Sequence, residues 1–384
     1  MADGSAEASS SLVYSSDDVY IFQCSDRDVI EFPALEMRGR GSIAAACGAH
    51  CSLTEAEIAT IAASLAWQVP SLQKANPSPS APVDLSALLQ EFLQSSNSEN
   101  SAAAADPIGE RVALVSQEKL RSFLDTLTSV YTRLSDAGDV PLQASFFIKG
   151  FLQGLGLDPF FYYFQEGYIP NVCADITGAL QPDVLVVVGA HMDDRAANIN
   201  DPTARAPGAN DDGSGSAMLS ELVRIFTETE TVFEYTVRFC WWAGEEQGLL
   251  GSTAYADALF NNGTEVVGML QGDMLAYRVP GARSQVDMAT RSTDYDLTML
   301  MNQVTAHYVP EILIGNTTSC CTDSASFYNV GYAAAAYNEA GGYTIDPEYH
   351  NTLDVVDRPG YNLPQLQQIT QAMLAGAAVL GNIL

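Results

Sequence analysis

The chain has 384 residues, of which 47 are Asp or Glu and 17 are Lys or Arg, so its formal net charge is −30 at pH 7. This charge argues against nucleic acid as a partner, because a phosphate backbone would be repelled; its simplest consequence is a well-solvated surface. No apolar run approaches the roughly 20 residues that span a bilayer, so the sequence predicts no membrane span. The length allows two domains, or one large domain with an appendage.

The first 110 residues are expected to form an accessory or propeptide-like region that ends in a linker. Two short β-like runs, VYIFQC and VIEFPAL, precede a helical stretch near Thr54–Ala66. Residues 77–84, PSPSAPVD, form a Pro/Ser break, and a short amphipathic helix, LSALLQEFLQ, follows. The low-complexity segment SSNSENSAAAADP is then typical of an exposed linker. We therefore divide the chain into an N-terminal region, 1–110, and a C-terminal domain, 111–384.

From about residue 115, helices and strands alternate. Apolar residues at helical spacing predict helices in SQEKLRSFLDTLTSVYTRL, PLQASFFIKGFLQGLG, GSAMLSELVRIFTE, GSTAYADALFNN and LPQLQQITQAMLAGAAVLGNIL. Strands are predicted in PFFYYF, NVCADITGAL, VLVVVGAHM, VFEYTVRFCWWA, GMLQGDMLAY, SQVDMAT and GYAAAAYNEA. Buried strands that alternate with helices indicate an α/β fold. We expect a mixed, largely parallel central sheet with helices on both faces.

Cysteine usage bears on the compartment. Cys240 lies inside the apolar run TVRFCWW and is predicted to be a buried free thiol. The other six cysteines would then allow three disulfides, with the connectivity left open. The CxxxC pair Cys47/Cys51 lacks the partner residues of a zinc finger. With the glycosylation sequons at Asn262 and Asn316 and the scarcity of Lys, the cysteines favour a secreted glycoprotein.

The N-terminal sequence bears on the same question. MADGSAEASSS has neither the basic segment nor the apolar segment of a signal peptide. Either the protein is intracellular, or a signal peptide has been removed. The cysteines and sequons favour the second interpretation, so we expect secretion.

Six acidic and imidazole side chains recur in the C-terminal half, most of them where a strand-like segment meets a Gly-rich turn. They are His191, Asp211, Glu245, Glu246, Asp273 and His350. Strand ends are where an α/β protein places a ligand site. Imidazole nitrogens and carboxylate oxygens bind Zn²⁺, and one carboxylate is left over as a base. The pattern predicts a two-metal hydrolase.

Each of these residues has an ordinary structural explanation when taken alone. The pair Glu245-Glu246 fits the acidic first turn of a helix, Asp211 fits a turn, and a lone His at a strand end is often structural. Asp273 follows an apolar strand, where an unpaired carboxylate would be costly. Their occurrence together, in this order, favours the catalytic interpretation. Because a metal-bound imidazole usually needs its second nitrogen held, Asp193, two residues after His191, is the candidate to hold it.

Six motifs resemble those of the M28 family of zinc aminopeptidases, in its bacterial and fungal leucyl-aminopeptidase type. They are GAHMDD, APGANDDGSGSAMLSEL, WWAGEEQGLLGS, QGDMLAY, TDSASFYNVGY and YHNTLD. Weaker similarity reaches back to about residue 115, through LRSFLDTL and NVCADITG. The resemblance implies a zinc-exopeptidase-like fold and two Zn²⁺ ions that share an activated water. It also implies that the substrates are peptides with a free N-terminus, with a preference for apolar N-terminal residues, and that the protein is a monomer.

The resemblance also assigns roles to the predicted site residues. One zinc ion would be bound by His191 and Asp273, and the other by Glu246 and His350. Asp211 would bridge the two ions. Glu245 would act first as general base and then as general acid, while Asp193 would orient His191.

The loop at Thr317–Ser324 departs from the family pattern. Where similar aminopeptidases have CxxxC followed by an Asp-His pair, this chain has two adjacent cysteines, Cys320 and Cys321, and then Asp323 and Ser324. Ser319 stands where a Tyr is common. A CxxxC disulfide is impossible here, so these cysteines pair elsewhere, pair with each other or stay free. The departures affect oxyanion support and pocket shape rather than the metal site.

Other functions stay open at this stage. A glutaminyl cyclase or a carboxypeptidase could use the same scaffold, but retention of both His191 and His350 with three acidic ligands favours two metals over the single zinc of such cyclases. A catalytically silent binding domain would be expected to lack a ligand or the base, and none is missing. The N-terminal region either limits access to the catalytic domain or is a structural extension.

Overall fold

The computed structural model describes residues 11–15, 19–23, 29–33, 83–96, 106–319 and 321–384. Its contacts divide the chain into two units, Met1–Ser80 and Ala81–Leu384. The first unit contains a three-stranded antiparallel sheet, whose strands are β1 (Ser11–Ser15), β2 (Val19–Gln23) and β3 (Val29–Pro33). Two of these strands, β2 and β3, were expected from VYIFQC and VIEFPAL, whereas the helix expected near Thr54–Ala66 lies outside the described residues.

The second unit is built on an eight-stranded sheet with the order β10-β9-β11-β8-β6-β7-β5-β4. The pairs β6/β7, β6/β8, β8/β11 and β9/β10 are parallel, and the remaining pairs are antiparallel. The expectation of a mixed, largely parallel sheet is confirmed. The strands are β4 (Phe160–Tyr162), β5 (Asn171–Ile176), β6 (Gln181–His191), β7 (Tyr235–Trp242), β8 (Val266–Gly272), β9 (Gln285–Ala289), β10 (Leu313–Thr317) and β11 (Ala334–Glu339).

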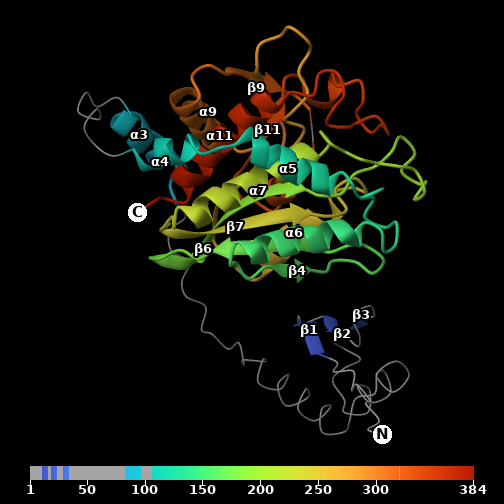
Figure 1. Ribbon diagram of the computed structural model, residues 1–384. Helices are drawn as coiled ribbons and strands as arrows, with labels where there is room; N and C mark the ends of the chain where they lie inside the picture. Colours follow the sequence, from blue (N-terminus) through green and yellow to red (C-terminus); the bar gives the residue numbers. More distant parts are fainter. Residues whose placement is uncertain (1–10, 16–18, 24–28, 34–82, 97–105, 320) are drawn as a thin grey trace, which may run out of the picture. The chain divides into compact units, whose positions relative to one another are not determined.

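Helices cover both faces of this sheet because successive side chains of each strand point to opposite faces. Along β8, Met269 packs in a cluster with Tyr255 of α8 and Phe327 of α10. Its neighbours Gly268 and Gly272 instead lie close to side chains of α9, α11 and α7. Figure 1 shows α5 and α7 on one side of the central strands. The helices are α3 (Leu85–Ser96), α4 (Pro107–Val112), α5 (Gln117–Leu127), α6 (Leu142–Gly154), α7 (Gly213–Glu228), α8 (Leu250–Asn261), α9 (Tyr295–Tyr308), α10 (Ser324–Asn329) and α11 (Leu363–Leu380).

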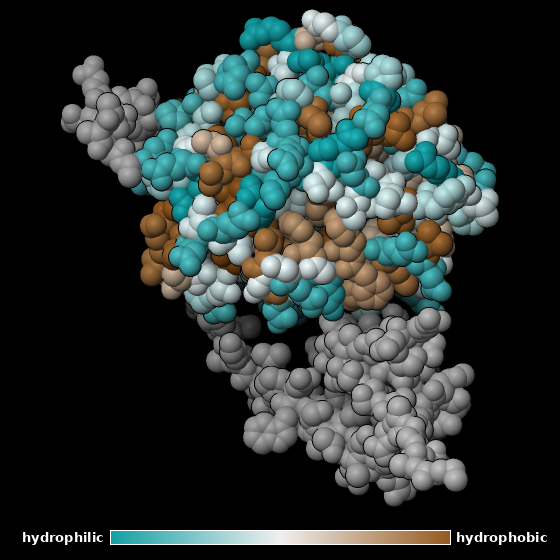
Figure 2. Space-filling view, viewed as in Figure 1, coloured by the Kyte–Doolittle hydropathy of each residue, from teal (hydrophilic) through white to brown (hydrophobic). Residues whose placement is uncertain are grey.

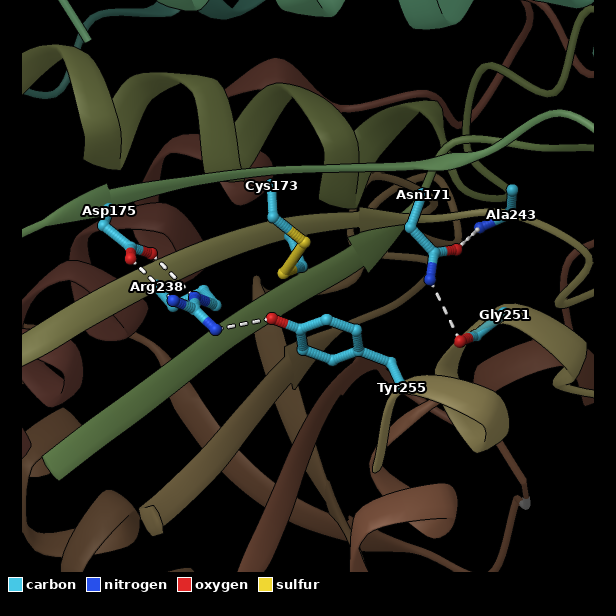
Figure 3. The surroundings of a disulfide bond; sticks show 8 residues. Asn171, Cys173, Asp175, Arg238, Ala243, Gly251 and Tyr255 are labelled. Carbon is cyan, nitrogen blue, oxygen red and sulfur yellow. Dashed lines mark hydrogen bonds and ion pairs between the residues drawn. A yellow bond between two sulfur atoms is a disulfide. The ribbon is translucent and has the colours of Figure 1, made fainter. Parts of the chain in front are cut away.

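The prediction that Cys240 is a free thiol is wrong, because it forms a disulfide with Cys173 (Figure 3). The two residues lie directly opposite each other in the antiparallel pair β5/β7, and both are fully buried. The two cysteines are 67 positions apart in the sequence, and the sequence alone does not show that their strands pair in this register. Cys321 is also disulfide-bonded.

Polar contacts beside this disulfide connect β5 to the chain that follows β7. Arg238 forms a paired hydrogen bond with the Asp175 carboxylate and donates to the Tyr255 hydroxyl. The buried Asn171 side chain accepts a hydrogen bond from the Ala243 N–H and donates one to the Gly251 carbonyl (Figure 3). Asn171 therefore clamps both ends of the turn that carries Glu245 and Glu246.

The surface agrees with the composition. Hydrophilic residues cover much of the viewed face of the second unit, with separate hydrophobic patches between them (Figure 2). In the part of the chain that the structure describes, no helix is both long enough and apolar enough to cross a membrane.

Candidate active site

The predicted site residues meet at one edge of the sheet, because β6, β7 and β8 are parallel and end there. His191 is the last residue of β6, and Asp273 follows directly after β8. Glu245 and Glu246 follow β7 in a tight turn, in which Gly244 has a left-handed φ of 70° that favours glycine. Loops on either side of these strand ends supply the remaining two members of the cluster, Asp211 and His350.

Asp211 lies between the two histidines. One oxygen of its carboxylate is 3.3 Å from His191 Nε2, and the other is 3.2 Å from His350 Nε2. Burial would raise the pKa of Asp211, but the two imidazoles hold the pKa below its usual value. The carboxylate that joins the two halves of the cluster is therefore ionised.

Each histidine also approaches a second carboxylate. Asp273 Oδ1 is 3.5 Å from His191 Nε2, and Glu246 Oε2 is 3.0 Å from His350 Nε2. Tyr349 stacks on the His350 ring, with 3.6 Å between the ring centroids, and so fixes its orientation. The result is two groups of donors, each with one imidazole and one carboxylate of its own, that share Asp211.

The carboxylates of this cluster fit cations better than they fit one another. Glu246 Oε1 is buried and has no hydrogen-bond partner among the described residues, while the buried Asp211 Oδ2 and Asp273 Oδ1 have only an imidazole nitrogen nearby. An unpartnered buried carboxylate oxygen is costly unless it is paired or binds a metal. Burial, and then the nearby Asp211 carboxylate, raise the pKa of Glu246 well above its usual value. Both nitrogen and oxygen donors are therefore present for metal ions such as Zn²⁺.

Glu245 lines the pocket beside the cluster, and its carboxylate accepts no hydrogen bond from the described residues. Burial raises its pKa well above the usual value, and this effect outweighs the opposing charge of His191. A carboxylate with a raised pKa that faces a pocket is suited to take up and release a proton. Glu245 thus differs from its neighbour Glu246, which points to His350.

Asp193 lies beside His191 as expected, but its contacts are more varied than the sequence suggested. His191 Nδ1 is 3.2 Å from the backbone carbonyl of Asp193 and 3.6 Å from the carboxylate. The same carboxylate accepts hydrogen bonds from the backbone N–H groups of Glu245 and Glu246, both at 3.3 Å. Asp193 therefore contacts the imidazole of β6 and also holds the turn after β7.

Sequence reasoning missed two buried carboxylates that hold the cluster in place. Asp212 accepts hydrogen bonds from the backbone N–H groups of His191, Gly215 and Met274, and so connects the ends of β6 and β8 to the start of α7. Asp354 accepts from the N–H of Asp211 at 3.0 Å. In the sequence, Asp212 is visible only as an acidic residue next to Asp211, and Asp354 only as one close to His350. Neither position indicates which backbone N–H group the carboxylate will contact.

Asp354 in turn belongs to a buried ionic network. Arg358 donates to the carboxylates of Asp354 and Asp346. The side chain of Asn210 donates to Asp346 and to both oxygens of Glu339. This network supports the loop that carries Asp211 through the hydrogen bonds to Asn210 and Asp211.

The departures at Ser319 and Ser324 lie where the sequence placed them, in the pocket wall. The Ser319 hydroxyl accepts a hydrogen bond from Thr317 at 3.0 Å and donates to the Gly341 carbonyl at 3.3 Å. Ser319 therefore fixes the loop against the segment after β11, in the place of a larger aromatic side chain.

The α/β fold, with a buried His/carboxylate cluster at the carboxyl ends of its parallel strands, is that of a metallopeptidase. Residues 171–377 match the model of peptidase family M28, and the chain belongs to that family. The resemblance seen in the sequence is thus confirmed.

Known proteins that resemble this chain agree with the assignment. A probable leucine aminopeptidase 1 of Trichophyton verrucosum is 31% identical over 275 residues, which cover 66% of this chain and 71% of that protein. The crystal structure of LapA from Legionella pneumophila superposes with a TM-score of 0.65 at 25% identity, covering 71% of this chain and 76% of LapA. A glutaminyl cyclase from Fimbriiglobus ruber shares the fold, with a TM-score of 0.57 at 15% identity and coverage of 69% of this chain and 96% of the cyclase.

Proposed function

We propose that this protein is a two-zinc aminopeptidase that hydrolyses the N-terminal peptide bond of peptides. The observation that carries the proposal is the position of Asp211, whose two carboxylate oxygens face His191 and His350 separately. In this assignment His191 and Asp273 would hold one zinc ion, Glu246 and His350 would hold the other, and Asp211 would serve both. Bound zinc would supply Lewis-acid chemistry, which polarises a carbonyl and makes water more acidic.

The residues of the site have separate roles in proton transfer and in positioning. Glu245 accepts the proton of the attacking water and later delivers it to the leaving amine. Asp193 holds His191 Nδ1 and, through its hydrogen bonds to the N–H groups of Glu245 and Glu246, fixes the turn that carries the proton acceptor. The Tyr349 ring, stacked on His350, keeps that imidazole pointed toward Asp211.

Metal removal tests the proposal. We expect that dialysis against a chelator abolishes hydrolysis of leucine p-nitroanilide, and that Zn²⁺ restores it. We also expect a lower Tm for the metal-free protein, because a ligand that binds only the folded state stabilises it. Full activity after complete metal removal would refute the proposal, and a single bound zinc with cyclisation of N-terminal Gln would indicate a glutaminyl cyclase instead.

We also propose that the protein is secreted, glycosylated and monomeric. The buried disulfide supports an oxidising compartment. Both sequon asparagines, Asn262 and Asn316, are exposed. The resemblance to leucyl aminopeptidases supports a preference for apolar N-terminal residues, and Met274 in the pocket wall provides an apolar surface for them.

For the N-terminal region, 1–110, we keep the hypothesis of an accessory or propeptide-like segment. If it limits access to the catalytic domain, limited proteolysis between residues 77 and 110 will raise the rate of leucine p-nitroanilide hydrolysis. The measurement is the activity before and after cleavage, with the site of cleavage verified by mass spectrometry. Unchanged activity would leave only the structural role.

A further inference from the structure

The pocket beside the metal cluster is lined mainly by small and polar residues. Beyond the cluster its wall includes the small or polar residues Ala289, Ser319, Thr322, Ser324, Ala325 and Asn338, together with Met274, Cys321, Tyr343 and Tyr349. Pockets that select an apolar side chain are lined predominantly by hydrophobic and aromatic groups. This wall therefore leaves room for a side chain that is not apolar.

Arg291 supplies the only guanidinium or ammonium group among the described residues that line this pocket. Arg291 is exposed and forms no hydrogen bond or ion pair with another described residue. Asp287, two residues before the end of β9, does not neutralise it, since the Asp287 carboxylate accepts from Gln285 Nε2 at 2.7 Å and from the Gly341 N–H at 2.9 Å. An exposed guanidinium in a pocket wall is free to form charge-assisted hydrogen bonds with a carboxylate of a substrate.

The register of the sheet directs β9 away from the metal cluster, and Arg291 follows two residues after the end of this strand. β9 runs antiparallel to β11, with Asp287 opposite Asn338 and Met288 opposite Tyr337. The N–H of Asp273, a member of the cluster, donates to the Tyr337 carbonyl. The part of β9 opposite Tyr337 therefore lies beside the metal cluster. β9 runs from there away from the cluster, and Ala289 lies about 7 Å beyond Asp287 at the usual rise per residue. Arg291 follows Ala289.

We propose that Arg291 lets this pocket also accept an acidic N-terminal residue, Glu before Asp and Glu before its neutral analogue Gln, beside the apolar residues that Met274 can contact. The inference rests on the proposed aminopeptidase function and names its substrate class. A substrate held with its scissile bond at the cluster directs its first side chain along β9 toward Arg291. The planar guanidinium matches a carboxylate with two parallel hydrogen bonds. Glu reaches one methylene further than Asp, which suits an arginine that lies beyond the end of β9.

The test compares substrates of equal shape and different charge. We expect the kcat/KM of glutamic acid α-(p-nitroanilide) to exceed that of the glutamine analogue in the zinc-loaded wild-type protein. Arg291→Ala is expected to lower the ratio of the two values about tenfold, as for loss of a charge-assisted hydrogen bond. Arg291→Glu is expected to lower it further and to raise the relative rate on the lysine p-nitroanilide. Free L-glutamate should also inhibit the wild-type protein more strongly than L-glutamine, and Arg291→Gln should remove this difference.

Arg283→Ala is the matched control, because Arg283 is also exposed and lies outside the pocket, where it donates to the Glu311 carbonyl. Its Glu-to-Gln ratio should equal that of the wild type. A wild-type preference for Gln over Glu, or equal ratios in the Arg291→Ala and Arg283→Ala variants, would overturn the inference. If leucine p-nitroanilide is hydrolysed under either of those outcomes, the aminopeptidase function stands and only the acidic preference falls. If no aminoacyl anilide is hydrolysed, both fall.

Discussion

Replacing Glu245 with Gln is expected to lower kcat on leucine p-nitroanilide by about 10²- to 10⁴-fold, the usual contribution of a general acid–base group. The substituted amide keeps the size of the side chain but cannot accept and release the proton. Because the Glu245 carboxylate is not hydrogen-bonded to the described residues, the substitution leaves the hydrogen bonds of its surroundings unchanged. Metal content, measured on the same sample by atomic absorption, should equal that of the wild-type protein.

The adjacent Glu246→Gln variant is the matched control. Glu246 Oε2 lies 3.0 Å from His350 Nε2, so this variant is expected to lose metal as well as activity. The two neighbours are therefore distinguished by metal content rather than by rate. A Glu245→Gln protein with near-normal kcat would remove Glu245 from the proton-transfer role.

Replacing Arg133 with Met is expected to lower the free energy of unfolding by about 3–5 kcal/mol, the usual cost of removing one partner of a buried ion pair. Arg133 is fully buried. Its guanidinium donates to the backbone carbonyls of Met192, Pro207 and Gly208 and forms an ion pair with Asp194 at 3.0 Å. The variant would leave these acceptors and a buried carboxylate unpaired.

Arg121→Met is the control for Arg133→Met, because Arg121 lies at the surface of the same domain. Arg121 pairs with Asp125 and Asp357 on the surface, and exposed ion pairs contribute at most about 1 kcal/mol. Urea unfolding of the Arg133→Met and Arg121→Met proteins, both loaded with zinc, measures the difference. Equal losses would mean that the contacts of Arg133 do not stabilise the fold.

The sequence was sufficient to predict the sheet and the strand ends that meet at the cluster. Long buried strands such as β6 carry a strong apolar signal, and the residues that end them follow from the chain order. The short strand β10 was not predicted, because three of its five positions, including Leu313 and Ile314, are exposed at the sheet edge. Its sequence lacks the alternation that marks a half-buried strand.

Contacts between distant segments could not be predicted from one sequence. The pairing of Cys173 with Cys240 depends on the register of β5 and β7. The support that Asp354 gives to Asp211 depends on a loop that follows β11. The position of Arg291 in the pocket depends on the antiparallel direction of β9. Each of these contacts requires a strand partner and register that local patterns do not specify.

The position of His350 has a consequence for how the enzyme is made. The side chains proposed to bind metal come from the ends of three parallel strands, the turn before α7 and a loop after β11. During synthesis, His191, Asp211, Glu246 and Asp273 leave the ribosome before His350 does. A nascent or shortened chain that ends before His350 lacks one imidazole, and it also lacks Asp354, which fixes the shared carboxylate. If the proposed ligand set is right, an unfinished chain is expected to hydrolyse no peptide bond until residues 350–354 have been added.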